Sequence, residues 1–383
     1  MKGQSTRRQA RAWKRAEKIY RAAATAVCLA VLLVQTGVSW SLARPAERPR
    51  EQIETEETKE AKETPAPSST PVPADVRAPE KADGSGRAGK VLLTAGRTAN
   101  QPVPGWQQDE KGWWYACGDE TAYQSGWEEI DGQRYHFDEE GYRDTGWTAI
   151  AGEGYYFDEN GVLNPDADSS RLLALTFDDG PGRYTGRLLD LLETTGARAT
   201  FFMLGRQVKE YGAETIPRMK QLGCIIGSHS YDHPNLKTAG PETARQQFAL
   251  TDEQIAQYNG GEGAQVIRFP YGEYTKELSA DTGRPCIYWN VDSMDWDSQN
   301  VQAIIQEVSG GIEGGEIILM HDIYETTVAA CEELIPELQA QGWQFVTIEE
   351  LAAANGYELE PGVTYFGFTQ YEKENGKVTD KNR

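Results

Sequence analysis

The sequence predicts a larger α/β domain whose parallel sheet closes like a barrel, a small module of β-hairpin repeats before it, and a transmembrane segment before both. Three observations support this prediction. Apolar runs of strand length alternate with helical segments between residues 167 and 360. A pattern of aromatic residues and glycines recurs every 20 residues between 105 and 166. A stretch without any charge, residues 22–42, stands near the N-terminus.

The N-terminal segment has the pattern of a membrane insertion signal. Residues 1–21 carry eight Lys or Arg and one Glu, and the uncharged stretch 22–42 is long enough to cross a bilayer as a helix. Basic flanks stay on the cytoplasmic side. We therefore expect a cytoplasmic basic tail (1–21) and a transmembrane anchor (22–42), or alternatively a signal sequence cleaved after Ala43. In both cases the rest of the chain is extracytoplasmic, membrane-anchored or secreted and associated with the cell wall.

The next segment, residues 43–104, has the composition of a disordered linker. It contains nine of the 18 prolines and no aromatic residue, so it cannot bury enough apolar surface to offset the entropy of ordering. The formal net charge of the whole chain is -21, and this excludes nucleic acid as an expected partner because phosphate binding needs a basic surface. Five cysteines show no CxxC spacing, and we expect most of them to be buried free thiols.

Residues 105–166 consist of repeats that each predict a hairpin. Gly126-Trp127 and Gly146-Trp147 each begin a unit in which aromatic and polar positions alternate around an Asp-Gly or Ala-Gly turn. Over about residues 105–164 these units resemble the cell-wall-binding, choline-binding-type repeats of Gram-positive surface proteins. The resemblance implies that ring side chains hold choline by cation–π attraction or stack on glycan. Alternatively, the same rings form the repeat core and the module is a spacer. The candidate ring residues are Trp113, Trp114, Trp127, Tyr135, Trp147 and Tyr155.

The α/β domain is expected over 167–360, followed by a C-terminal tail over 361–383. Its strands are apolar on both faces, which indicates a parallel sheet covered on both sides by helices. The predicted strands are 172–177, 199–204, 224–226, 266–269, 286–291, 317–320 and 345–348. The predicted helices are 184–194, one that ends over 216–222, 241–258, 300–309 and 328–339.

Polar clusters follow five of these strands, at the end where α/β barrels place their sites. Two histidines four residues apart can bind one metal ion, and of two adjacent carboxylates one can bind metal while the other acts as a base. Each cluster taken alone also has an ordinary structural explanation, such as a strand-to-turn Asp-Gly-Pro or a surface Arg. The clusters are Asp178-Asp179-Gly180-Pro181, His229 to His233, Arg268 to Gly272, Asp292 to Trp296, and Leu319 to Asp322.

Together and in this order, the clusters resemble the five motifs of the polysaccharide deacetylase family, the NodB-homology domain of carbohydrate esterase family 4. The resemblance covers about residues 168–352 and implies a deformed (β/α) barrel. The segment His321-Asp322-Ile323-Tyr324, together with Thr327 and Val328, resembles in particular the peptidoglycan N-acetylglucosamine deacetylases of Gram-positive bacteria. This implies metal-dependent hydrolysis of N-acetyl groups in cell-wall glycan, with release of acetate.

The resemblance also implies the metal site and the two acid–base groups. Asp179, His229 and His233 would bind one divalent metal, Zn²⁺, with Co²⁺, Mn²⁺ or Ni²⁺ as alternatives. Asp178 would be the general base and His321 the general acid.

The remaining family roles are supporting ones. Arg268 would orient the base, and Asp295 would tune the acid. Tyr271, through its backbone N–H, and the side chains of Trp296 and Leu319 would bind substrate.

The polymer is less determined than the chemistry. The expected tether and the wall-type repeats favour peptidoglycan, but chitooligosaccharide, poly-N-acetylglucosamine and acetylxylan are alternatives within the same chemistry. A different class of protein is also considered: a surface protein that binds glycan or choline and carries an inactive catalytic domain.

Overall fold

The computed structural model describes residues 86–93 and 103–382, which belong to one compact unit, residues 78–383. The expected basic tail and membrane segment, 1–42, and most of the linker lie outside the described residues. Within the described ranges no helix has both the length and the apolarity that a membrane span requires.

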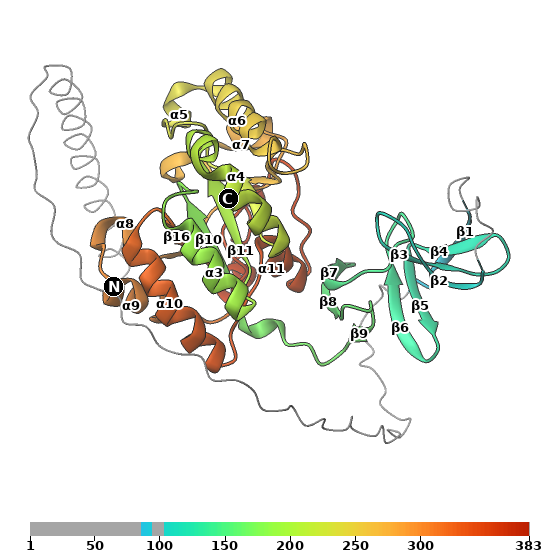
Figure 1. The fold of residues 1–383 in the computed structure, drawn as a ribbon. Helices are drawn as coiled ribbons and strands as arrows, with labels where there is room; N and C mark the ends of the chain where they lie inside the picture. Colours follow the sequence, from blue (N-terminus) through green and yellow to red (C-terminus); the bar gives the residue numbers. More distant parts are fainter. Residues whose placement is uncertain (1–85, 94–102, 383) are drawn as a thin grey trace, which may run out of the picture. The chain divides into compact units, whose positions relative to one another are not determined.

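The repeat module is built from antiparallel hairpins (Figure 1). Hairpin β5–β6 turns at Asp131-Gly132, and hairpin β7–β8 turns at Ala151-Gly152. All four turn residues have positive φ, as a two-residue type I′ turn requires, so the expected hairpins are confirmed. The strands are β1 (Gly89–Leu92), β2 (Gly105–Gln108), β3 (Trp113–Ala116), β4 (Thr121–Gln124), β5 (Gly126–Ile130), β6 (Gln133–Phe137), β7 (Gly146–Ile150), β8 (Glu153–Phe157) and β9 (Leu163–Asn164).

Strand β1 lies within the segment 43–104 that the composition predicts to be disordered. It pairs antiparallel with β4 and extends the first sheet to the order β1-β4-β3-β2. The composition argument considers only side-chain burial. An edge strand such as β1, whose four residues are all exposed, is held by backbone hydrogen bonds instead.

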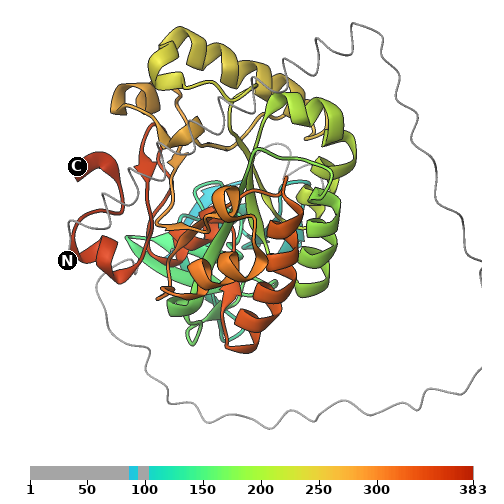
Figure 2. The same cartoon turned by 90° about the vertical axis from the view of Figure 1, so that its left-hand side faces the viewer.

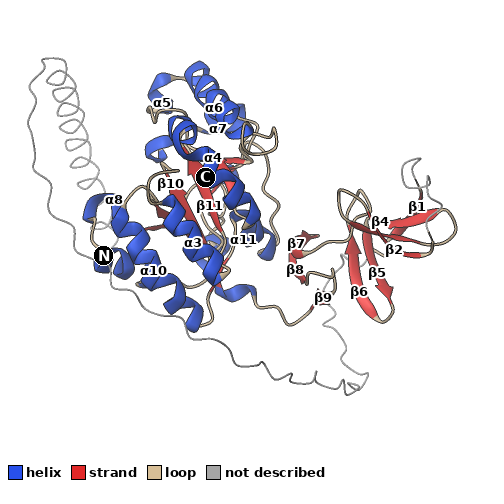
Figure 3. Ribbon diagram, viewed as in Figure 1, coloured by secondary structure: helices blue, strands red, loops and turns tan. Residues whose placement is uncertain are grey.

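The α/β domain contains one predominantly parallel sheet (Figure 3). Its strands are β10 (Leu172–Asp178), β11 (Ala199–Met203), β12 (Ile225–Ser228), β13 (Val266–Ile267), β14 (Cys286–Ile287), β15 (Val291–Asp292), β16 (Ile317–Met320), β17 (Gln344–Phe345) and β18 (Thr364–Tyr365). The order is β15-β16-β10-β11-β12-β13-β14-β18, and β17 also pairs with β10. All strand pairs of this sheet are parallel, as predicted from the apolar strands.

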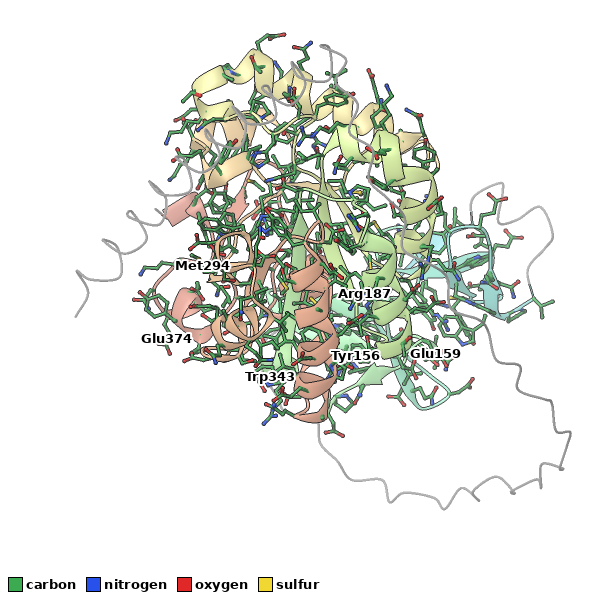
Figure 4. The ribbon with its side chains drawn as sticks, turned by 60° about the vertical axis from the view of Figure 1, so that its left-hand side comes forward. Tyr156, Glu159, Arg187, Met294, Trp343 and Glu374 are labelled. Carbon is green, nitrogen blue, oxygen red and sulfur yellow. The ribbon has the colours of Figure 1, made fainter. Side chains whose placement is uncertain are left out.

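Helices alternate with these strands, and α3, α4 and α10 lie along the outer side of the sheet (Figures 1 and 2). The helices are α3 (Thr185–Thr195), α4 (Gly205–Gln221), α5 (Leu236–Ala239), α6 (Pro241–Ala256), α7 (Lys276–Asp281), α8 (Asp295–Ser298), α9 (Val301–Ser309), α10 (Glu325–Ala340), α11 (Ile348–Ala354) and α12 (Gln370–Glu374). Met294 stands at the start of α8 (Figure 4). Short 3₁₀ turns occupy Ser169–Arg171, Pro270–Gly272 and Asp380–Asn382.

The sheet is curled into an incomplete barrel, and the chain itself requires this. Strands β14 and β15 stand six positions apart in the strand order, which in a flat sheet would separate them by about 29 Å. Only Tyr288, Trp289 and Asn290 connect them, a link that spans at most about 14 Å. The two ends of the sheet are therefore brought close together. This arrangement is consistent with the expected deformed (β/α) barrel.

This topology also corrects the prediction of a single strand over 286–291. The segment splits because β14 pairs with β13 and β18, whereas β15 pairs with β16 at the other end of the sheet. The predicted strand 345–348 is likewise shorter, since helix α11 begins at Ile348 with Thr347 as its capping residue. Strand β18 comes from the expected C-terminal tail and pairs with β14, so residues 364–365 complete the sheet.

Strand β10 shows how the sheet separates the core from the site. Its odd residues, such as Leu175 and Phe177, pack in a cluster with α3, α4 and α10. Its even residues face the barrel interior: Leu172 and Ala174 belong to a second cluster with α11, and Thr176 and Asp178 follow on the same face. Of the described cysteines, Cys224, Cys286 and Cys331 are buried free thiols, as expected, and Cys117 is a half-buried free thiol.

Candidate active site

The predicted polar clusters meet at the carboxyl ends of neighbouring strands. The register pairs Phe177 with Met320, so that Asp178 and His321 come side by side at the ends of β10 and β16. Strand β11 separates β10 from β12, which ends at Ser228, directly before His229. Five strands therefore deliver the five clusters to one end of the barrel.

Asp179, His229 and His233 form a group that fits a metal ion. One ligand atom from each lies within 4.8 Å of the others. His233 Nε2 is 3.5 Å and His229 Nε2 is 3.9 Å from Asp179 Oδ1. That carboxylate oxygen is buried and has no hydrogen-bond partner among the described residues, which is costly unless a cation occupies the space. Two imidazoles and a carboxylate are a donor set typical of zinc sites that keep open positions.

The orientation of His229 prepares it for this role. Its Nδ1 lies 2.8 Å from the carbonyl oxygen of Arg268, and because a carbonyl only accepts, Nδ1 carries the proton. The lone pair is therefore on Nε2, which lies 3.5 Å from Asp178 Oδ2 and 3.9 Å from Asp179 Oδ1. Burial lowers the pKa of His229 to about 3, so the imidazole is neutral at physiological pH, as a metal ligand must be.

Asp178 is fixed by Arg268 in the barrel interior. Arg268 Nη1 donates to Asp178 Oδ1 at 2.7 Å and to Thr176 Oγ1 at 2.8 Å. The same fully buried guanidinium donates to the carbonyls of Ile287 and Tyr288, at 2.9 Å each. Burial raises the pKa of Asp178, and the Arg268 charge opposes this rise. Arg268 therefore holds the Asp178 carboxylate in place, and its role in orienting a base stays a prediction.

His321 and Asp295 form a second charged pair at the end of the neighbouring strand. His321 Nδ1 lies 2.8 Å from Asp295 Oδ1, and the backbone N–H of His321 donates to Asp295 Oδ2 at 2.7 Å. Burial alone would lower the pKa of His321, but the Asp295 carboxylate, with contributions from Asp179 and Asp178, raises it to about 10. The imidazole is therefore protonated at neutral pH, and Nε2–H is left to act on a substrate.

The three predicted substrate residues surround this centre from different elements. Tyr271 lies in the turn after β13 with φ of 62°, and its ring packs against His233 with 4.4 Å between ring centroids. Its side chain is 37% exposed. Leu319 is buried on β16, two residues before the acid, and Trp296 lies on α8, where its Nε1 donates to Asp292 Oδ1 at 3.4 Å.

Two buried polar contacts were not predicted from the sequence. Thr327, in the first turn of α10, donates to Asp295 Oδ2 at 2.7 Å. Asp322 accepts a hydrogen bond from Thr185 Oγ1, which itself accepts from the backbone N–H of Gly182 at 2.7 Å. These bonds hold Asp295, the partner of His321, and the loop after Asp179. The signal in the sequence was a hydroxyl residue in the first turn of both helices, Thr185 in α3 and Thr327 in α10.

The six candidate ring residues of the repeats are mostly inside the module. Trp114, Trp127 and Tyr135 are buried, and Trp147 and Tyr155 are half-buried. Trp127 packs against Tyr155 with 5.0 Å between ring centroids. Only Trp113, at 37%, is exposed among the six.

Comparisons with known proteins agree with both parts of the chain. A family model described as polysaccharide deacetylase matches residues 166–284. A model described as choline-binding repeat matches residues 124–163. The first match includes the segments of Asp178, Asp179, His229, His233 and Arg268 described above, but ends before His321.

Curated relatives match about half of this chain. The chain is 36% identical over 206 residues to the peptidoglycan-N-acetylglucosamine deacetylase PgdA of Listeria monocytogenes, covering 54% of this chain and 43% of the relative. It is 37% identical over 184 residues to the peptidoglycan-N-acetylmuramic acid deacetylase PdaC of Bacillus subtilis, covering 48% of this chain and 39% of the relative. The chain thus spans less than half the length of these two relatives.

A third relative is matched over most of its length. The peptidoglycan-N-acetylglucosamine deacetylase of Bacillus cereus is 33% identical over 187 residues, which cover 47% of this chain and 67% of the relative. This relative is thus 33% identical and is covered over two thirds of its length. The chain therefore belongs to the polysaccharide deacetylase family.

Proposed function

We propose that this protein removes N-acetyl groups from cell-wall glycan, most specifically from N-acetylglucosamine of peptidoglycan, and releases acetate. The observation that carries the proposal is the buried, unpaired Asp179 Oδ1 facing two imidazole nitrogens, next to a carboxylate held by Arg268. An amide is a poor electrophile and water a poor nucleophile. Hydrolysis needs a base, an acid and an electrophilic centre together, and this end of the barrel contains candidates for all three.

Asp179, His229 and His233 would hold the metal, for which we propose Zn²⁺, with Co²⁺, Mn²⁺ and Ni²⁺ as alternatives. When bound, the metal supplies a Lewis acid that polarises the acetyl carbonyl and acidifies water. Asp178, oriented by Arg268, accepts the proton of the attacking water. It can do so because its remaining oxygen, Oδ2, lies on the side of the metal ligands, 3.5 Å from His229 Nε2.

The second half of the reaction needs a proton for the departing amine. His321 donates it from Nε2, and Asp295 holds the imidazolium in place through Nδ1. The backbone N–H of Tyr271 would stabilise the negative charge that develops on the acetyl oxygen. Trp296 and Leu319 would line the sugar and acetyl positions.

The proposed location of the protein rests on the expected N-terminal segment, linker and repeats. We propose that the chain acts outside the cytoplasm, tethered or secreted through residues 1–42, and that 43–104 act as linker. The repeats over 105–166 would contact or space the wall polymer, and the deacetylase domain begins at about residue 167. Two of the relatives are named for deacetylation of peptidoglycan N-acetylglucosamine and one for N-acetylmuramic acid, so the second sugar is the alternative substrate.

Acetate release from defined polymers tests the proposal. The panel is peptidoglycan, chitooligosaccharide, poly-N-acetylglucosamine and acetylxylan, each with the native chain, with chelator, and after Zn²⁺ is added back. We expect release from peptidoglycan that chelator removes and metal restores. Each deacetylation replaces one acetyl group by a hydrogen and lowers the mass by about 42 Da. Mass spectra of the muropeptides then show whether this loss falls on glucosamine or on muramic acid. No release from any polymer after metal is added would leave only the inactive, glycan-binding alternative.

A further inference from the structure

A guanidinium occupies an aromatic site in the repeat module. The central carbon of the Arg143 guanidinium lies 5.5 Å from the ring centroid of Trp106 and 5.3 Å from that of Trp113. Both distances are within the range of cation–π attraction. The two rings come from the first repeat, on β2 and β3, whereas Arg143 follows the hairpin of the second repeat.

Contacts with the third repeat hold the Arg143 side chain in this position. Its Nη1 donates to the carbonyl of Asn160 at 2.6 Å and its Nη2 to the carbonyl of Glu159 at 2.9 Å. Glu159 lies in the turn after β8 (Figure 4). A Cβ added to Gly161 would lie 2.7 Å from Arg143 Cδ, so only glycine leaves room for the side chain. One cation thus connects three consecutive repeats.

The ring faces compensate for an incomplete set of hydrogen bonds. Arg143 Nε is buried and has no hydrogen-bond partner among the described residues, and burial lowers the pKa of the guanidinium. Such a position is unfavourable for a charge unless something replaces the lost water. The faces of Trp106 and Trp113 do this, as they would for a bound organic cation.

The site borders a cavity on its Trp113 side, whereas Trp106 does not line that cavity. Trp113 and Arg143 line this cavity of about 680 Å³. Its lining also contains four carboxylate residues, against only Lys111 and Arg143 as cations. The four are Asp138, Glu140, Asp144 and Glu159. Without Arg143 the charge and the rings together would favour a quaternary ammonium ligand.

We propose that Arg143 is the built-in ligand of the site between Trp106 and Trp113 and that it excludes quaternary ammonium compounds such as choline from that site. The first three repeats are then joined by an internal cation where a choline-binding repeat would take an external one. The inference is independent of the deacetylase chemistry. It concerns what the module can bind, whether or not the α/β domain is active.

Choline binding by the full chain tests this directly. Equilibrium dialysis with radiolabelled choline and quenching of tryptophan fluorescence are measured for the native chain and for Arg143→Ala. We expect no saturable binding that depends on Trp113 in the native chain. Arg143→Ala should bind choline saturably, and at least about tenfold more tightly than any residual binding by the native chain, because two ring faces become available. The double variant Arg143→Ala with Trp113→Ala should lose this gain.

A matched control removes Arg134, a second arginine that covers a ring within the described part of the repeat module. Arg134 is exposed and its guanidinium lies 4.2 Å from the ring centroid of Trp127, but Trp127 is buried. Arg134→Ala should therefore gain no choline binding. If Arg143→Ala fails to fold by circular dichroism and thermal melting, Arg143→Gln vacates the rings while keeping a polar end for the carbonyls.

Two results would overturn the proposal. One is saturable choline binding by the native chain that Trp113→Ala abolishes. The other is the absence of any gain in whichever of the two Arg143 variants melts at the native temperature.

Discussion

The hydroxyl of Thr327 donates to Asp295 Oδ2 at 2.7 Å, and both residues are fully buried. The same oxygen accepts the backbone N–H of His321, and Oδ1 accepts from the His321 ring. Three donors thus fix one carboxylate, which in turn fixes the proposed general acid. The orientation of His321 is therefore set by helix α10 as well as by its own strand.

Thr327→Val should affect the chemical step through this contact. The variant removes one donor from a buried carboxylate, and we expect kcat to fall about tenfold, equivalent to a hydrogen bond with a charged group of about 1.4 kcal/mol. KM should stay the same because Thr327 lies behind Asp295. Thr327→Ser keeps the hydroxyl and should restore kcat. A loss of thermal stability without any change of kcat in Thr327→Val would mean that the contact is only structural.

Asp178→Asn should separate the base from the metal site. We expect activity to fall by about 10²–10⁴-fold, the usual contribution of a general base, while bound metal stays at the native amount. Asn also leaves Arg268 without its buried counter-charge, so the free energy of unfolding should fall by about 3 kcal/mol in urea titrations.

Asp179→Asn is the comparison for the base variant, and it should lose metal. Equal loss of metal by the two variants, measured by mass spectrometry of the dialysed proteins, would contradict the division of roles between these carboxylates.

Metal affinity should depend on the three proposed ligands, Asp179, His229 and His233. Removing an outer-shell partner of a metal ligand usually costs 10–100-fold in affinity, so removing a ligand, as in His233→Gln, should weaken Zn²⁺ binding by about 100-fold or more. His136 is the matched control because it lies in the repeat module and pairs with Asp144 at 2.6 Å. Competition with a chromophoric chelator measures the Zn²⁺ affinity of His233→Gln and of the same substitution at His136. Similar affinities in these two variants would refute the site.

The pH dependence should follow the His321–Asp295 pair. The pKa of His321 in the folded chain, about 10, is above the ordinary value of 6.5. The pair therefore contributes stability that is fully present below pH 6.5 and is lost as the pH rises towards 10. Asp295→Asn removes the main raising charge, so the alkaline limb of kcat/KM should move to lower pH. An unchanged alkaline limb in this variant would show that another group sets it.

Local sequence was sufficient to predict the features that are formed by residues close together along the chain. The spacing of His229 and His233, the adjacent carboxylates of Asp178 and Asp179, and the apolar runs before them all lie within a few residues. Most of the predicted strands and helices therefore end within a few residues of observed ones, whereas the short helices α5, α7, α8, α11 and α12 were not predicted. The Asp-Gly and Ala-Gly turns likewise predicted their hairpins, because two-residue turns need positive φ.

Tertiary structure decided what depends on the closure of the barrel. Residues 286–291 look like one apolar strand in the sequence. They form two strands because β14 and β15 pair with different partners at opposite ends of the curled sheet. The contacts of Thr327 with Asp295 and of Arg143 with Trp106 join residues 32 or more positions apart. The sequence contains many possible contact partners for a hydroxyl or a guanidinium, and tertiary packing decides which of them is contacted. The sequence by itself determined which residue types stand at the candidate site, and the fold determined which other side chains hold them in place.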